Sequence, residues 1–270
     1  MGINNIKELQ LTQTEPDNII TLDVSSVKNL QIGYQAETIF LKASEDDQLV
    51  IKEYINGLKG TEYYGKVAAN RFKTTVRYGR REEVNIHTFV EVYLPVSWRG
   101  ELQLSSLYGC ITTEDDWVLD RLEIQANEGA VTLKAIDAPR IRIVTAVSPV
   151  LVERAAGFVD IHTVSGTICA KSIDGGAKLA TSDAPIYASF EGLNNIIECT
   201  TLNGTTNLIL PQNCGMKVDG VSKRGQILCD IEGLDVKVKP GNVTCIAGLL
   251  GEKPYQNVRL SSINGDIILK

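Results

Sequence analysis

The fold is decided by a short stretch, Ile161-His-Thr-Val-Ser-Gly166-Thr-Ile-Cys169, in which alternating apolar residues lead into a small polar pair and a turn residue. Alternation with period two is typical of a β-strand, and glycine beside small polar residues is typical of a tight turn. The stretch therefore predicts a strand, a turn and a second strand. We expect the turn glycine to supply a positive φ, which residues with a Cβ rarely adopt.

The same frame recurs along the chain at nearly constant spacing. The intervals between successive turn residues are 20, 20, 17, 19, 19, 21 and 40 residues, and the turn residues are Gly109, Gly129, Pro149, Gly166, Pro185, Gly204, Gly225 and Gly265. We interpret the last interval as two periods. Copies of constant length place like residues above like, so a stack buries an apolar column that one copy cannot bury alone.

The repeat predicts an all-β fold, a β-solenoid similar to a single-stranded β-helix with rungs of about 20 residues and a smaller N-terminal β region. A sandwich of hairpins or a barrel is the alternative, because tight turns between short strands also suit those folds. Helical periodicity is nearly absent from the repeat region.

The repeat frame divides the chain into two parts. Residues 1–95 alternate without the frame and predict a small antiparallel β region that caps the solenoid. Val90-Glu-Val-Tyr-Leu-Pro95 predicts a strand that ends at a proline, since proline cannot donate to a strand ladder. Residues 96–270 form the predicted repeat domain.

The C-terminal end of the repeat domain is expected to need a cover. From 230 to 257 the frame degrades, and we expect an irregular rung that carries a loop. The chain stops at Lys270, inside a predicted strand whose open edge would attract another strand. Either the 230–257 loop or a second copy of the chain is expected to cover this end, the latter giving a homo-oligomer through the C-terminal strand edge.

Composition and charge exclude several classes of protein. The 270 residues are 43% hydrophobic and 22% charged, which excludes a disordered chain, a collagen and a coiled coil. A net charge of -6 creates no global attraction for nucleic acid or an anionic membrane. No apolar run is long enough to span a membrane, and the N-terminus lacks a signal-peptide pattern. As it stands the sequence predicts a cytoplasmic protein, or an envelope or cell-surface protein if a leader has been removed.

Several motifs resemble a known family. Val92-Tyr-Leu-Pro95, followed by Ser105-Ser-Leu-Tyr-Gly109 and by repeated Thr-Val-Ser-Gly and Leu-Asn-Gly frames, is similar to a bacterial β-strand-repeat family of unknown function whose members are often labelled "putative adhesins". Leu208-Ile-Leu-Pro211 and Lys217-Val-Asp-Gly-Val-Ser-Lys-Arg-Gly225 resemble a later part of that family. The resemblance covers about residues 85–270. It implies an all-β solenoid without an assigned enzymatic activity, in envelope-associated or stress-linked settings, and it carries over no catalytic residue.

The residues capable of acid, base or nucleophilic chemistry form no convincing catalytic set. His162 is expected to share a strand face with Asp160, but the chain has only two histidines, the other being His87. Glycoside hydrolysis needs two carboxylates at a defined separation. Asp160 and Asp183 lie in neighbouring rungs and are not expected to stack; the other candidate acids are Glu114, Asp115, Asp116 and Asp137.

Other candidate sites have simpler interpretations. The runs 45–47 and 114–116 are expected to be solvated acidic turns rather than calcium ligands, and Ser25-Ser-Val-Lys28 matches a serine-lysine spacing without a supporting second motif. The six cysteines lack closely spaced pairs and predict buried free thiols; they are Cys110, Cys169, Cys199, Cys214, Cys229 and Cys245. No catalytic, cofactor-binding or metal-binding residue is therefore predicted.

One segment is locally basic. It contains the aromatics Phe72 and Tyr78 and the cations Lys66, Arg71, Lys73, Arg77, Arg80 and Arg81. Arginine beside aromatics suits phosphate contact and base stacking. An exposed hairpin whose charges discourage edge aggregation, with Glu82 and Glu83 to pair with them, is the simpler interpretation, so no nucleic-acid partner is predicted.

The sequence thus predicts a non-enzymatic binding or interaction module, adhesin-like, that presents repeated side chains to a glycan, a cell-wall polymer or a protein. In this interpretation Thr, Ser and Asn near each turn form a ladder of hydrogen-bonding groups. A carbohydrate-active β-helical enzyme with outward carboxylates is one alternative. An assembly scaffold that pairs end to end through its C-terminal strand is another.

Overall fold

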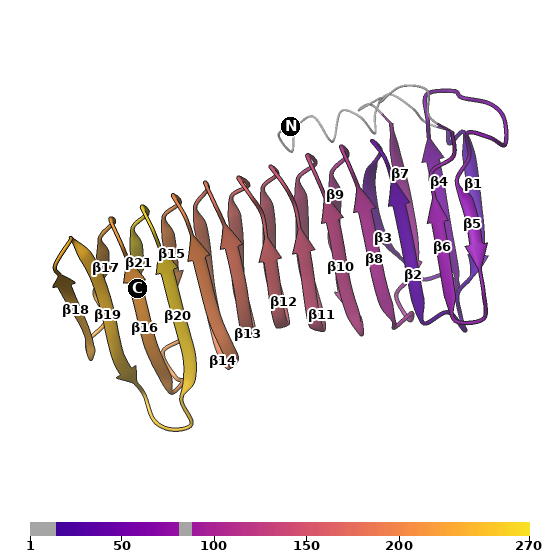
Figure 1. Ribbon diagram of the computed structural model, residues 1–270. Helices are drawn as coiled ribbons and strands as arrows, with labels where there is room; N and C mark the ends of the chain where they lie inside the picture. Colours follow the sequence, from indigo (N-terminus) through magenta and orange to yellow (C-terminus); the bar gives the residue numbers. More distant parts are fainter. Residues whose placement is uncertain (1–14, 81–87) are drawn as a thin grey trace. The chain divides into compact units, whose positions relative to one another are not determined.

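The computed structural model describes residues 15–80 and 88–270, and within those ranges it consists of strands and turns (Figure 1). The chain forms two compact units, Met1–Ile136 and Asp137–Lys270. Each unit is a stack of strand-turn-strand rungs, so the predicted all-β, solenoid-like class is confirmed. The predicted division at residue 95 stays a prediction.

The first sheet of unit 1 is mostly parallel. Its strands occur in the order β5 (Lys66–Ala69), β6 (Lys73–Arg77), β2 (Asn29–Tyr34), β8 (Glu101–Ser106) and β10 (Arg121–Ala126). Only the β5–β6 pair is antiparallel. Figure 1 shows β2 beside β8, although many residues separate them in the chain.

The second sheet of unit 1 mixes both strand directions. Its strands occur in the order β1 (Asn18–Asp23), β4 (Gln48–Tyr54), β7 (Phe89–Pro95), β3 (Thr38–Ser44) and β9 (Ile111–Val118). The pairs β1–β4 and β4–β7 are antiparallel, and β7–β3–β9 is parallel. Strand β7 ends at Pro95, as predicted.

The interior of unit 1 is built from columns of identical or similar side chains. Leu30, Leu102 and Leu122 are in register on β2, β8 and β10, and each is at most 1% exposed. Burial of one leucine stabilises the fold by about 1.5–3 kcal/mol, so each added rung extends a continuous source of stability.

The N-terminal region contains a rung that the sequence frame did not reveal. Strands β2 and β3 are parallel to β8 and β9 and in register with them, so the prediction of a purely antiparallel region was wrong for this segment. The turn of this rung has no glycine in the expected frame. Instead the Glu37 carboxylate accepts hydrogen bonds from the backbone N–H groups of Gln35 (3.1 Å) and Ala36 (3.0 Å).

Unit 2 contains three long strands that each contribute to two sheets. They are β12 (Val150–His162), β13 (Ile168–Thr181) and β14 (Ile186–Thr201), and they follow β11 (Val131–Val144), which begins in unit 1. Gly157 (φ 114°) and Gly175 (φ 147°) are in register in β12 and β13, and a residue with a Cβ would be strained at either position.

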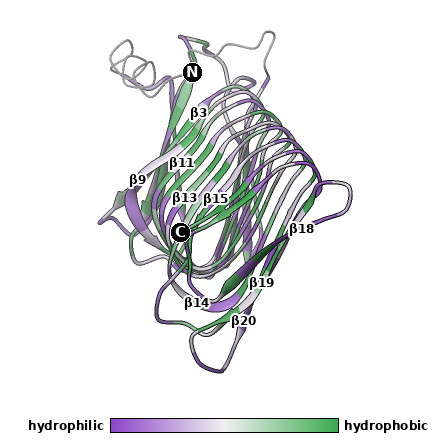
Figure 2. Ribbon diagram, turned by 90° about the vertical axis from the view of Figure 1, so that its left-hand side faces the viewer, coloured by the Kyte–Doolittle hydropathy of each residue, from purple (hydrophilic) through white to green (hydrophobic). Residues whose placement is uncertain are grey.

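Beyond β14 the two sheets of unit 2 continue on separate strands. One continues through β20 (Gln256–Ser262), β16 (Met216–Ser222), β19 (Val243–Leu250) and β18 (Leu234–Lys239). The other continues through β15 (Thr206–Ile209), β21 (Ile267–Leu269) and β17 (Ile227–Cys229). Figure 2 shows these strands in two layers, with β15 in one and β19 and β20 in the other.

The C-terminal strand is internal, which corrects the predicted end of the stack. β20 lies between β14 and β16, and β21 lies between β15 and β17. Because both edges of β21 are paired within the chain, they are not free to join a second copy. The predicted homo-oligomer contact through the C-terminal strand edge is therefore wrong.

Two further expectations about this end were also wrong. The interval from Gly225 to Gly265 does not hold two periods, because these glycines lie on adjacent rungs: a Cβ on Gly225 would meet the Gly265 oxygen at 2.3 Å. Residues 230–257 do not form an irregular rung: they contain β18 and β19, antiparallel strands that extend the sheet from β16. Val238 on β18 is 73% exposed between Lys237 and Lys239, whose charges protect this edge from further pairing.

The turn glycines are required for a different reason from the one predicted. Gly166, Gly204 and Gly265 do not have positive φ angles. A Cβ on Gly204 would lie 1.7 Å from the carbonyl oxygen of Ala184, and one on Gly166 would lie 1.8 Å from that of Ser148. Glycine is therefore needed because successive turns approach each other closely.

Candidate binding surface

The outer face of the β6–β2–β8–β10 sheet carries two in-register rows of mostly polar residues. We call these eight residues the amide face: Thr75, Gln31, Gln103 and Glu123 in one row, and Arg77, Gly33, Ser105 and Gln125 in the other. Their alternate neighbours in the strands point into the unit. Because parallel strands are about 4.8 Å apart, each row presents hydrogen-bonding groups at a constant spacing.

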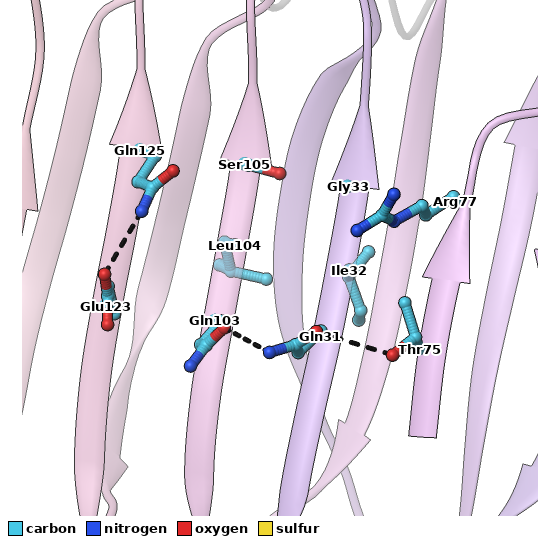
Figure 3. Close-up of a pocket in the computed structure, with 10 residues that line it drawn as sticks. All are labelled: Gln31, Ile32, Gly33, Thr75, Arg77, Gln103, Leu104, Ser105, Glu123 and Gln125. Carbon is cyan, nitrogen blue, oxygen red and sulfur yellow. Dashed lines mark hydrogen bonds between the residues drawn. The ribbon is translucent and has the colours of Figure 1, made fainter. Parts of the chain in front are cut away.

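Hydrogen bonds between side chains hold the first row in place (Figure 3). The Thr75 hydroxyl donates to Gln31 Oε1 (3.4 Å), and Gln31 Nε2 donates to Gln103 Oε1. At the other end Gln125 Nε2 donates to Glu123 Oε1 (3.1 Å). These contacts fix the planes of the amide groups before a ligand arrives.

A shallow hollow of about 150 Å³ lies over this face. Gly33 forms part of its floor, and a Cβ there would come within 2.8 Å of the Ser105 hydroxyl. Figure 3 shows the Arg77 side chain beside Gly33 at the edge of the hollow. Arg77 is exposed and pairs with no carboxylate in the described part of the chain, so its guanidinium is available to a ligand.

Local sequence patterns do not reveal the amide face as a site. Gln31 and Gln103 are far apart in the chain and meet only because β2 pairs with β8. A signal was present, since Leu30-Gln-Ile32 and Leu102-Gln-Leu104 share one pattern, with an acidic variant in Leu122-Glu-Ile124. Only the register turns these similar triplets into one surface.

The basic segment forms the hairpin β5–β6, as its simpler interpretation predicted. Lys66 donates to the Thr61 carbonyl oxygen, and the Arg71 guanidinium lies 5.3 Å from the centre of the Phe72 ring. Arg77 belongs to the amide face instead. Arg81, Glu82, Glu83 and His87 lie outside the described residues.

Asp160 and His162 lie together on β12, as predicted. His162 Nε2 is 2.7 Å from Asp160 Oδ1, and Arg140 Nη2 is 3.5 Å from Asp160 Oδ2. The Asp160 side chain is only 10% exposed. Because a buried carboxylate is costly unless it is paired, the Arg140 guanidinium serves to hold it in the sheet.

Asp183 is placed apart from Asp160. The residue that pairs with Asp160 is Lys178 on β13, whereas Asp183 lies on the following turn, where it accepts a hydrogen bond from Asn203 (2.5 Å). Asn264 in turn donates to Asn203 (2.6 Å). The two acids therefore face different surroundings, and Asp137 is an exposed residue of β11.

The row of turn hydroxyls is not the ligand-facing ladder that the sequence predicted. The Thr201 hydroxyl donates to the Gly204 oxygen (2.8 Å), and the Ser222 hydroxyl donates to the Gly265 oxygen (2.9 Å). Thr163 is 7% exposed and accepts a hydrogen bond from the Gly166 N–H. These three hydroxyls satisfy turn backbone groups, whereas Ser165, Asn203 and Asn264 of the predicted ladder are exposed.

The two acidic runs have different outcomes. Residues 45–47 form the turn between β3 and β4, as expected. Residues 114–116 lie within β9, which corrects the prediction of a turn. Asp115 accepts a hydrogen bond from the Ala43 N–H (2.7 Å), and Asp116 pairs with Lys134 (3.0 Å).

The remaining candidates occupy structural positions. Ser25 donates its N–H to Asp23 Oδ1 (2.9 Å), and this bond lowers the pKa of the Asp23 carboxyl. All six cysteines are free, with Cys110 and Cys199 buried and the others half-buried, which corrects the expectation that every thiol is buried. Burial also raises the pKa of the Cys199 thiol.

Residues 15–80 and 88–270 lack two further features. No cluster of three His, Cys, Asp or Glu side chains is arranged to hold a metal ion within those ranges. The same ranges contain no helix with the length and apolar character that crossing a membrane requires.

Comparison with known proteins identifies relatives of this fold. The family model described as Toastrack DUF4097 matches residues 27–270. Solved structures similar to the chain include a "putative adhesin" from Bacteroides fragilis (14% identity, 96% of this chain and 100% of that chain, TM-score 0.45). They also include a "putative adhesin" from Parabacteroides distasonis (10% identity, 94% and 96%, TM-score 0.39) and a "putative cell adhesion protein" from Clostridium sporogenes (12% identity, 94% and 97%, TM-score 0.27). No curated protein matches the chain.

Proposed function

The chain belongs to the Toastrack DUF4097 family, and from the geometry of its amide face we propose that it is a non-enzymatic, adhesin-like module that binds a glycan chain. The observation that carries the proposal is the in-register row Thr75–Gln31–Gln103–Glu123, with an open hollow beside it. The glycan lies across the strands, so that successive rungs contact successive parts of it.

The chemistry of the face suits a polyhydroxylated ligand. Amide and hydroxyl side chains each offer both donors and acceptors, as sugar hydroxyls do. The hydrogen bonds between Thr75, Gln31 and Gln103 fix these groups in advance, which reduces the entropy lost on binding. A flat, open face also accepts a long polymer more readily than a compact molecule.

Arg77 adds a preference for an acidic glycan. A guanidinium forms two parallel hydrogen bonds with a carboxylate or a phosphate, and it is always charged. Glu123 is the only carboxylate of the amide face and already accepts bonds from Arg121 (3.2 Å) and Gln125 (3.1 Å). A carboxylate or phosphate on the polymer is therefore placed over Arg77 and Gly33.

The test is binding of the purified protein to an array of neutral and acidic glycans and bacterial wall polymers, with each well analysed by mass spectrometry. We expect saturable binding to acidic glycans without change in their mass. Arg77→Glu reverses the key charge, and Gly33→Val fills the hollow, so each should weaken binding by at least about tenfold, the equivalent of one charge-assisted hydrogen bond.

Arg71→Glu is the matched control, because Arg71 is an exposed arginine of the same hairpin outside the amide face. Equal losses for Arg71→Glu and Arg77→Glu would reduce the effect to net charge and remove the proposed site. Shortened glycans in the wells would instead indicate the carbohydrate-active alternative and contradict a purely binding role.

A further inference from the structure

Unit 2 carries a second surface of different character on its outer side. An apolar groove of about 490 Å³ crosses strands β13, β14, β15 and β21. We define the groove by six residues: Cys169, Tyr187, Ile209, Ile268, Lys171 and Lys270. All of them lie in one unit, and none belongs to the amide face.

The register explains how these side chains meet. Cys169 pairs with Tyr187, Tyr187 pairs with Asn207, and Asn207 pairs with Ile268. These four residues form one outward row. A second row contains Ser189 on β14 and Ile209 on β15. Lys171 on β13 lies at one end of this row, and Lys270, which follows β21, lies at the other. The floor is therefore largely apolar and lies between two lysines.

The apolar residues of the groove are exposed. Tyr187 is 46% exposed and Ile209 is 54% exposed, although both lie in regular strands. A cleft of this size, with mostly apolar walls and a few polar groups, is typical of a binding site for a small molecule.

The charged side chains that line the groove are both lysines. Lys171 and Lys270 are exposed, and neither forms an ion pair with a carboxylate in the described ranges. No acidic residue lines the groove. An occupant that complements this surface needs an apolar body and a negative group.

The other sheet of the same unit shows that this arrangement is not a general property of the fold. There the outward positions in register are Asp160, Lys178, Glu198, Arg259 and Asp219, charges that alternate in sign from strand to strand. Lys178 and Glu198 approach to 3.6 Å. Cross-strand pairs of opposite charge stabilise a sheet without any ligand, whereas the groove leaves both its apolar surface and its cations unmatched.

We propose that the apolar groove binds a fatty acid, with the acyl chain along Tyr187, Ile209 and Ile268 and the carboxylate at Lys171 or Lys270. The acyl chain removes the exposed apolar side chains from water, which supplies the affinity. The lysines supply the preference for an anionic head. This site is independent of the glycan proposed for the amide face.

The experiment is calorimetric titration of the full chain with oleate, below the concentration at which oleate aggregates. We expect saturable one-to-one binding, and binding of oleyl alcohol weaker by about fivefold, because an exposed charge pair contributes at most about that factor. Ile209→Asp places a carboxylate against the acyl chain and should weaken oleate binding by at least about tenfold. Lys171→Glu combined with Lys270→Glu should remove the preference for oleate over oleyl alcohol.

Two matched variants control for folding and charge. Val164→Asp changes a valine that is 55% exposed on a turn outside the groove, and Lys223→Glu changes an exposed lysine outside it; both should bind oleate as the unchanged chain does. Absence of saturable oleate binding would overturn the proposal. So would losses for Val164→Asp as large as for Ile209→Asp, or binding to anionic lipid vesicles without binding to monomeric oleate, which would indicate a membrane surface as the partner.

Discussion

Glu53 is a fully buried carboxylate that joins four segments of unit 1. It lies on β4, is 0% exposed, and accepts hydrogen bonds from Asn18 Nδ2 (2.6 Å), the Tyr34 hydroxyl (2.8 Å) and the Gly65 N–H (2.9 Å). These donors come from β1, β2 and the segment before β5. The carboxylate therefore ties the antiparallel strands at this end to the first rung.

Glu53→Ala should lower the free energy of unfolding by about 3 kcal/mol or more, because it leaves several buried donors without an acceptor. Urea unfolding followed by tryptophan fluorescence measures this loss within unit 1, since both tryptophans, Trp98 and Trp117, are buried there. Tyr34→Phe is the control and should cost only about 1 kcal/mol, because it removes a single donor. A change below about 0.5 kcal/mol for Glu53→Ala would refute this role, since that is the effect of an ordinary surface substitution.

Glu91 is the centre of a second polar cluster, on β7. Lys42 donates to its Oε1, while the hydroxyls of Tyr93 (3.0 Å) and Tyr54 (3.2 Å) donate to its Oε2. Burial alone raises the pKa of Glu91, but the Lys42 charge and the hydrogen bonds outweigh it, and the pKa is lowered. Burial, followed by the charge of Glu91, raises the pKa of Tyr93 to about 12.

This cluster predicts a loss of stability at both ends of the pH scale. The Glu91 carboxylate stabilises the fold above its unfolded pKa, and this contribution is lost as the pH falls through the lowered value. The Tyr93 phenol keeps its proton to a higher pH in the folded chain than in the unfolded one. Its contribution is therefore present below about pH 10 and is lost as the pH rises toward 12.

Glu91→Gln should lower the pKa of Tyr93 but leave it above 10, because burial remains. Titration of the Tyr93 ring resonances by NMR measures this, and an unchanged pKa would exclude the influence of Glu91.

At the scale of the single element, the turn is the unit that sets the repeat. Most turns place a glycine where the backbone of the neighbouring turn approaches, and in several turns a buried Ser or Thr hydroxyl bonds to the turn backbone. Ser148 and Ala184 occupy this glycine position in two rungs, as the contacts of Gly166 and Gly204 show. Serine and alanine are therefore tolerated at this position in those two rungs.

Gly204→Ala should destabilise unit 2 by about 2 kcal/mol, because its Cβ would press on the Ala184 carbonyl and force the two turns apart. Ala184→Gly is the matched control one rung away; it adds no atoms and should cost only about 0.5–1 kcal/mol through the added freedom of the unfolded chain. Thermal unfolding followed by circular dichroism compares the two. Equal losses would mean that the close approach of the turns does not determine the residue.

The sequence predicts those elements whose cause is local. Alternation and the Ser/Thr-x-x-Gly frame correctly predict the strands around Gly166 and Gly204, and Pro95 correctly predicts the end of β7. The rung of β2 and β3 was missed because its turn lacks the Ser/Thr-x-x-Gly frame. In this turn the Glu37 carboxylate bonds to the turn backbone and replaces the hydroxyl and glycine of the other turns. Most of the amide face was missed because it depends on the register of β2 with β8, which no local pattern specifies.

At the scale of the whole chain, the order of the rungs differs from their order in the sequence at both ends. In unit 1 the rung β2–β3 lies between β6–β7 and β8–β9. In unit 2 the rung β20–β21 lies between β14–β15 and β16–β17. In each case antiparallel strands continue the sheet beyond the displaced rung, namely β4 and β1 in unit 1 and β19 and β18 in unit 2.

Because of this displacement, the last two strands of the chain connect neighbouring strands in both sheets of unit 2. A chain that ends at Lys253 lacks β20 and β21, and it leaves unpaired edges on β14, β15, β16 and β17. Unpaired edges of this kind recruit an added strand.

We expect the shortened chain to lose hydrogen-exchange protection on those four strands, and a synthetic peptide of residues 254–270 to restore it by inserting between them. The same peptide with Val258 and Leu260 changed to aspartate is the control, because both side chains are buried, at 0% and 3% exposure. Full protection in the shortened chain without the peptide would mean that β14 and β16 can pair directly and that the inserted rung is dispensable.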